Sequence, residues 1–177
     1  MLEEMMKLPL TDLPAPMSTK RVRFEASAMA SFLLGSVKRG LCADAVEIAL
    51  LQGGCFRGNC DYDAGSFSLG DLYKELKFEI PMALVSLPGW VIEDSVRNTR
   101  SATKPAAQLL NLDDACVVSP EHRVISVDSQ PFSRDRMYKV AIYQYLLTGL
   151  DGIEPLMSYV KAHVSVPDEE TCLPVKQ

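Results

Sequence analysis

The sequence has little of what a hydrolytic active site needs. Its 177 residues include two histidines, His122 and His163, and neither has an acidic residue or another histidine four positions later. It contains no G-x-S-x-G nucleophile motif and no G-x-x-x-x-G-K-[ST] phosphate loop. Two-metal hydrolases need clusters of histidine and carboxylate ligands at regular spacing. We therefore expect this chain to carry no catalytic residues and no metal site.

Long apolar runs and an excess of positive charge are also lacking. The longest strongly apolar stretches, such as residues 45–51, fall far short of the roughly 20 residues that cross a bilayer. The formal net charge is −5, so no global cationic field exists to hold a nucleic-acid backbone. We expect neither a membrane span nor a nucleic-acid partner.

The first ten residues lack a secretory signal, because they carry Glu3 and Glu4 and have no long apolar run before a cleavage site. The cytoplasm is slightly favoured for the chain as given. An extracellular location fits a chain cut from a longer precursor, so the compartment stays open.

Five cysteines are an odd number, and a chain of this length does not need disulfide bonds to be stable. We expect free, mostly buried thiols at these positions. Cys55 and Cys60 have four residues between them but no companion pair, which makes a weak zinc motif. The cysteines are residues 42, 55, 60, 116 and 172.

Composition then indicates one globular domain, because 47% of the residues are hydrophobic and 23% are charged. Residues 1–19, rich in proline, are expected to form a linker or arm after a short helix at residues 1–7. The domain is expected over residues 20–165, followed by a polar tail at 166–177.

The hydrophobic pattern predicts short helices and strands in irregular alternation. Helices are expected where apolar residues recur every three or four positions, and Ser68 with Asp71 resembles a capping box. Because no regular βαβ series occurs, we predict an α+β fold. The expected helices are 27–39, 68–76, 90–99 and 154–163, and the expected strands are 46–51, 83–87, 115–118, 124–127 and 138–143.

Several residues suit a small anionic, aromatic ligand. The run from Gln52 to Arg57 (QGGCFR) follows a buried strand, so Gly53 and Gly54 would let the backbone approach a ligand while the arginine offers a fork of donors. An ordinary turn with a solvated arginine explains this run equally well.

Three further side chains extend this set. Phe78 and Tyr145 could stack on a flat ring, or could be core aromatics. Asp151 could accept from a ribose, or could simply occupy a turn. Lys20, Arg21 and Arg23 form a basic cluster whose default is a solvated strand edge.

The order of these segments resembles the C-terminal domain of the 5'-nucleotidase family. Four blocks are similar to the family's N-G-G-G-x-R, I-T-x-x-D-L-x-x-x-L-P-F, leucine-glycine turn and Y-x-V-x-x-x-x-F-L-x-x-G-G-D-G patterns. They are QGGCFR at 52–57, FSLGDLYKELKF at 67–78, LVSLPG at 84–89 and YKVAIYQYLLTGLDG at 138–152, and RFEASAMASF at 23–32 echoes the family's opening arginine motif.

The resemblance implies a four-layer α/β/β/α domain with mixed sheets that recognises nucleoside monophosphates or nucleosides. It implies that hydrolysis belongs to a metallophosphoesterase domain with two divalent metals such as zinc, upstream of Met1 or on another chain. By position in the motifs, it implies a substrate-binding set of Arg23, Gln52, Gly53, Gly54, Arg57, Phe78, Tyr145 and Asp151.

The chain departs from the family pattern at several of these positions. Gln52 replaces an asparagine, Cys55 a glycine and Lys77 a proline, while Leu150 stands at a glycine that is freer in its backbone. Two hypotheses follow: the chain is the recognition part of a 5'-nucleotidase-like enzyme, or it is a stand-alone, non-catalytic binding or structural subunit of an assembly.

Overall fold

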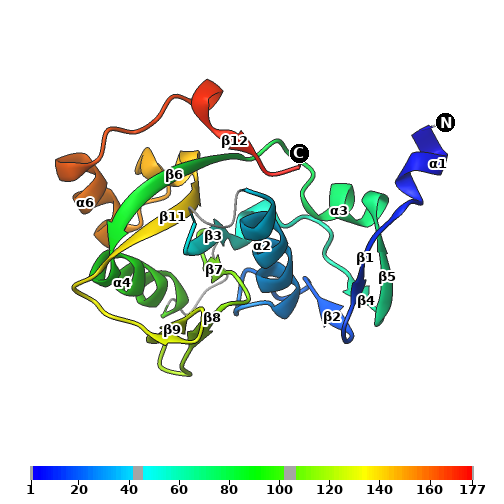
Figure 1. Ribbon diagram of the computed structural model, residues 1–177, viewed down its shortest axis with the longest axis horizontal. Coiled ribbons are helices and arrows are strands. Elements are labelled where there is room, and N and C mark those ends of the chain that lie inside the picture. The colour runs from blue at the N-terminus through cyan, green and yellow to red at the C-terminus, as the bar shows by residue number, and fades with distance from the viewer. Residues whose placement is uncertain (1, 42–45, 102–106, 177) are drawn as a thin grey trace.

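The computed structural model describes residues 2–41, 46–101 and 107–176. Its centre is a five-stranded mixed sheet in the order β12-β6-β11-β3-β7 (Figure 1). Strand β11 pairs parallel to β3 and antiparallel to β6, while β12 and β7 pair antiparallel at the two edges. The strands are β3 (Ile48–Gln52), β6 (Pro81–Pro88), β7 (Leu110–Leu112), β11 (Met137–Tyr143) and β12 (Leu173–Pro174).

Alternation along the strands builds a core on each face of this sheet. In β11, Val140 and Ile142 belong to one buried cluster and Ala141 to the other. Helices α4 (Gly89–Arg100) and α6 (Glu154–His163) pack on the first face, and α2 (Ala28–Gly40) packs on the second. The α+β class and the mixed sheet that we predict are confirmed.

Helix boundaries follow the capping signals in the sequence. Ser27 caps α2 by accepting a hydrogen bond from the Ala30 amide at 3.2 Å. Ser68 and Asp71 form a complete capping box at the start of α3 (Leu69–Glu75), as the sequence predicts. The remaining helices are α1 (Leu2–Met6) and α5 (Gln144–Leu147), with short 3-10 turns η1 (Gly53–Cys55) and η2 (Glu169–Thr171).

Smaller sheets surround the central one. A three-stranded sheet joins β8 (Cys116–Val118), β9 (Val124–Val127) and β10 (Gln130–Pro131), and two ribbons pair β1 (Pro9–Leu13) with β5 (Gly65–Ser68) and β2 (Met17–Ser18) with β4 (Asp61–Tyr62). Part of the segment expected to be an arm, β1 and β2, is therefore paired with the domain, and Leu13 is buried in the α2-side core.

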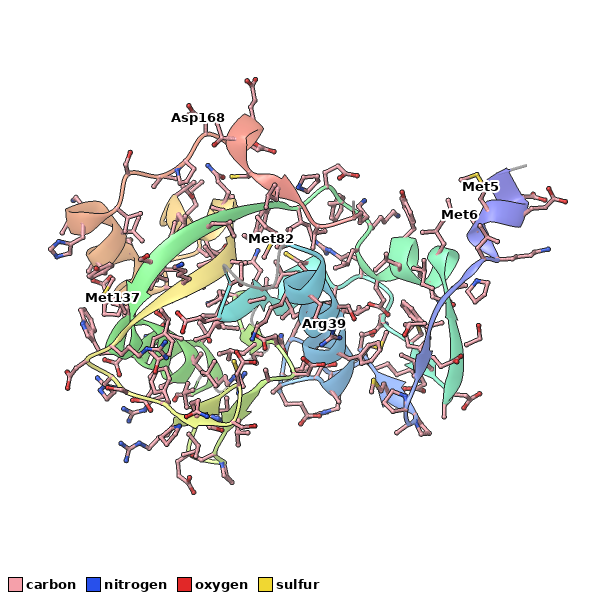
Figure 2. The ribbon with its side chains drawn as sticks, viewed as in Figure 1. Met5, Met6, Arg39, Met82, Met137 and Asp168 are labelled. Carbon is pink, nitrogen blue, oxygen red and sulfur yellow. The ribbon has the colours of Figure 1, made fainter. Side chains whose placement is uncertain are left out.

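The segment expected to be a polar tail also packs on the domain. After α6 it crosses the end of the sheet, past Asp168 (Figure 2), and forms β12 at the free edge of β6. Val175 is buried in the α2-side core, and Lys176 pairs with Glu79 at 2.8 Å.

The described cysteines are free, as predicted. Cys55 is buried, and Cys60, Cys116 and Cys172 are partly buried. Cys42 lies outside the described residues.

Candidate functional site

Sheet topology brings most of the predicted ligand residues to one edge of the central sheet, the edge formed by the carboxyl ends of β3 and β11 and not by an outer strand. Because β3 and β11 run parallel, Gln52 and Tyr143 end their strands on the same side of the sheet. Strand β6 begins there, since Met82 lies opposite Tyr143. The connections that carry Phe78, Tyr145 and Asp151 therefore start or end at this edge, beside the turn of Gly53 and Gly54.

The two glycines of that turn pack against the protein's own backbone. A Cβ on Gly53 would lie 2.4 Å from the Val22 carbonyl oxygen, so only glycine fits there. The Gly53 amide donates to the Leu109 carbonyl and the Gly54 amide to the Ala107 carbonyl, both at 2.7 Å. The close approach that we expected toward a ligand is in this structure an approach to neighbouring chain segments.

Two buried acceptors at this edge have no hydrogen-bond donor. They are Oε1 of Gln52 and Oδ2 of Asp151, and only two other buried side-chain polar atoms of the described residues share this state. Burial raises the pKa of Asp151. Buried polar atoms are nearly always satisfied, so an unsatisfied pair in one place is unusual.

The Cys55 thiol links these acceptors to Arg57. Burial raises the pKa of Cys55 to about 12, a contact with Gln52 and the charge of Arg57 act to lower it, and Asp151 acts to raise it. The four side chains are thus electrostatic neighbours. Leu150, before the aspartate, has no positive φ, so its replacement of glycine strains no backbone here.

Three aromatic rings, of which Phe78 is exposed and Tyr143 and Tyr145 are half-buried, border the same edge. The Arg57 guanidinium lies 5.2 Å from the ring centre of Phe78, whose side chain is 55% exposed. Tyr145 stacks on Tyr143 with centroids 5.7 Å apart. Within the described residues no ring contact joins Phe78 to Tyr145, so the two rings are not stacked on each other.

The two predicted arginines line one hollow of about 300 Å³. Arg23 and Arg57 share it with Lys20, Phe24 and Asn59 among others. Lys20 and Arg21 are exposed, as expected, but they lie in a turn and not at a strand edge. Lys20 pairs with Asp61 at 2.5 Å and Arg21 with Glu25 at 2.8 Å.

A buried carboxylate that we did not predict holds the walls of this hollow together. Glu75 is fully buried, and its carboxylate accepts from the Thr19 hydroxyl at 2.8 Å, the Tyr62 hydroxyl at 2.7 Å and the Gly58 amide at 3.1 Å. Its backbone carbonyl accepts from the Arg57 amide at 2.8 Å. The available signal was its position three residues after Leu72, on the apolar face of the helix.

The described part of the chain gathers no metal site. Over residues 2–41, 46–101 and 107–176, no three His, Cys, Asp or Glu side chains lie close enough together to hold a metal ion. Across the same ranges, no helix combines the length and the hydropathy that spanning a bilayer requires.

Comparison with solved structures places this fold. The 5'-nucleotidase precursor of Thermus thermophilus superposes with a TM-score of 0.74 at 19% identity, over 99% of this chain and 36% of that one. The NAD nucleotidase of Haemophilus influenzae gives 0.71 at 13% identity, over 98% and 34%. The 5'-nucleotidase of Candida albicans gives 0.51 at 12% identity, over 98% and 38%.

This chain thus spans about a third of the length of the proteins it resembles. No curated protein matches its sequence. The model of the 5'-nucleotidase C-terminal domain matches residues 9–158, which is most of the chain and includes every predicted ligand residue. The α+β fold with mixed sheets is accordingly that of this domain, and the chain belongs to the 5'-nucleotidase C-terminal domain family.

Proposed function

We propose that this chain binds the substrate of a 5'-nucleotidase-like phosphohydrolase, which converts a nucleoside monophosphate to a nucleoside and phosphate. The chemistry would come from a metallophosphoesterase domain in the same polypeptide or on a partner chain. The names of the similar structures, a 5'-nucleotidase and an NAD nucleotidase, support a nucleotide as the substrate class.

The observation that carries the proposal is the pair of unsatisfied acceptors, Gln52 Oε1 and Asp151 Oδ2. A ribose offers the hydroxyl donors that such acceptors lack. Leaving buried acceptors unpaired costs about 1 to 3 kcal/mol each, so a ligand that donates to them recovers that energy.

The other predicted residues would bind the base and the phosphate of the same ligand. Phe78 and Tyr145 would hold the base by stacking, and Arg23 and Arg57 would meet the phosphate, for which a guanidinium fork is well suited. The contribution to catalysis is orientation: binding the remote nucleoside places the phosphate against groups held elsewhere.

The two divalent metals of such an enzyme do not fit this chain, because its described residues offer no cluster of ligands. They belong to the proposed catalytic domain.

Calorimetric titration of the purified chain with adenosine and with adenosine monophosphate tests the proposal. Because one stacked base contributes about 1 to 3 kcal/mol, we expect Phe78→Ala to weaken both ligands by about tenfold or more. Tyr73→Ala, which removes a ring that is 42% exposed on α3, is the matched control and should bind as the parent does. Absence of heat with the parent, or equal loss in the control, would contradict the proposal.

The departures at Gln52, Cys55 and Lys77 favour a second candidate, a non-catalytic binding or structural subunit. The encoded sequence upstream of Met1 separates the two. Metal-ligand motifs of the D-x-H and G-N-H-D type would support the enzyme, and an upstream sequence without them would support the subunit.

A further inference from the structure

Arg100, in the last turn of α4, is a partly buried cation with no carboxylate partner among the residues that the structure describes. Two other cations that are buried or partly buried have such partners: Lys38 pairs with Asp128 at 2.9 Å, and Arg134 with Asp94 at 2.8 Å. Burying a charge without a partner is costly, and proteins rarely tolerate it without a reason.

Within the described ranges, a single hydrogen bond holds this guanidinium. Its Nε donates to the Leu110 carbonyl at 3.0 Å, and among the described residues its two terminal nitrogens have no acceptor. Burial lowers the pKa of Arg100 to about 10, whereas hydrogen bonds with Asp94 and Glu93 raise that of Arg134. An external anion would therefore stabilise the charge of Arg100.

Arg100 lines a hollow of about 430 Å³ between the end of α4, the β8–β9 turn and the segment before α2. Its polar lining includes the Ser119 hydroxyl and the His122 imidazole. Its apolar wall is formed by Leu109 and Val118. Acidic groups lie nearby but are engaged elsewhere. Glu25 lines the hollow and bonds to Arg21 at 2.8 Å, and the Glu121 carboxylate is fully exposed, held by Ser119 and its own backbone.

We propose that this hollow binds a small oxyanion, a carboxylate or a phosphate, gripped by the free side of the Arg100 guanidinium. The planar fork matches two oxygens of either group, and the His122 imidazole offers a further donor. The apolar wall would take the carbon part of an organic acid or phosphate ester. The site is separate from the Gln52 and Asp151 cluster and does not depend on the proposed nucleotidase role.

Phe24 lines both this hollow and the one that contains Arg23 and Arg57, so the two are neighbours. The test must therefore report which of them an anion enters. Amide chemical shifts do so, because each hollow has its own backbone segments.

The experiment is an amide NMR titration of the full chain with sodium phosphate and, separately, sodium acetate, each against sodium chloride at equal ionic strength. We expect saturable shifts at Ser119 to Arg123 with at least one of the two anions, and the tighter anion identifies the ligand class. Arg100→Met should abolish these shifts. Arg97→Gln, which removes an exposed arginine from the same last turn, should keep them.

Arg100→Lys is a second variant that keeps the test valid if Arg100→Met does not fold. Lysine keeps the positive charge but cannot bind two oxygens of one anion as a guanidinium does. We expect it to fold with the parent's spectrum and to bind at least about tenfold more weakly. The proposal is overturned if neither anion shifts Ser119 to Arg123 in the parent, or if Arg100→Lys and Arg97→Gln bind equally well.

Discussion

Asp151, a residue that we propose binds the ligand, destabilises the ligand-free protein when it is ionised. Its Oδ2 atom is buried without a donor, and burial raises its pKa above the ordinary value of about 3.9. A raised pKa on a carboxylate means that the native state holds the proton more tightly than the unfolded chain does. Ionisation of Asp151 therefore destabilises the fold, and this loss develops as the pH rises from about 3.9 through the folded-state pKa.

Asp151→Asn should consequently raise the melting temperature at pH 7, by about 2 to 4 °C for a gain of about 1 kcal/mol. The difference from the parent should vanish in acid, where the parent's carboxyl is also neutral. The same variant should weaken nucleoside binding, since it removes a charged acceptor. Calorimetric melting at pH 7 and pH 3 measures the first effect, and a variant that melts below the parent at pH 7 would refute it.

At the residue scale, the sequence draws attention to Asp151 and Arg57 because both stand in glycine-bearing turns. The structure places both near Cys55, and their part in binding stays a prediction. The sequence could not show that Gln52 Oε1 lacks a donor or that Arg100 lacks a carboxylate partner among the described residues. Both features depend on which distant side chains the fold brings near.

At the scale of elements, Glu75 joins three segments that are distant in the chain. Glu75 lies on helix α3. Its partners are Thr19, just after β2, and Gly58 and Tyr62, which lie in the segment from the end of η1 through β4. A Cβ on Gly58 would lie 1.9 Å from a Glu75 carboxylate oxygen, so the loop can approach only as glycine.

Glu75→Gln should destabilise the protein by about 2 to 3 kcal/mol, because a buried amide group would face hydroxyl donors and lose charge-assisted hydrogen bonds. Urea unfolding followed by circular dichroism gives this value. Glu170→Gln, at an exposed position, is the control and should stay within about 0.5 kcal/mol of the parent. Equal stability of the two variants would show that the Glu75 network is not structural.

Elements were predictable where their signals are local. Apolar residues at helical spacing predict α2, the capping signal at Ser68 predicts α3, and apolar runs predict β3, β6 and β11. The short strands β2 and β12 were not predicted, since each has two residues and exists only through a partner far along the chain. No local pattern encodes such a pairing.

For the whole molecule, the C-terminal segment is a structural part of the domain. It supplies an edge strand to the main sheet and places Val175 in the α2-side core. Burial of one valine contributes about 1.5 to 3 kcal/mol, so removal of residues 166–177 should lower the melting temperature by about 5 °C or more.

Removal of residues 1–7, where most of the described side chains are exposed, is the matched truncation and should have a smaller effect. Differential scanning calorimetry of both truncations decides the point. If the two lower the melting temperature equally, the C-terminal strand adds no specific stability.

Strand β11 has a further consequence for how the domain opens. Its side chains alternate between the two cores, and its backbone pairs with β3 on one side and β6 on the other. Neither core can loosen far without disturbing the strand that both share, so the two layers are coupled in one cooperative unfolding unit. Val22 and Phe56 belong to the α2-side core and also line the hollow of Arg23 and Arg57. We therefore expect this hollow to lose its shape only when the domain as a whole unfolds.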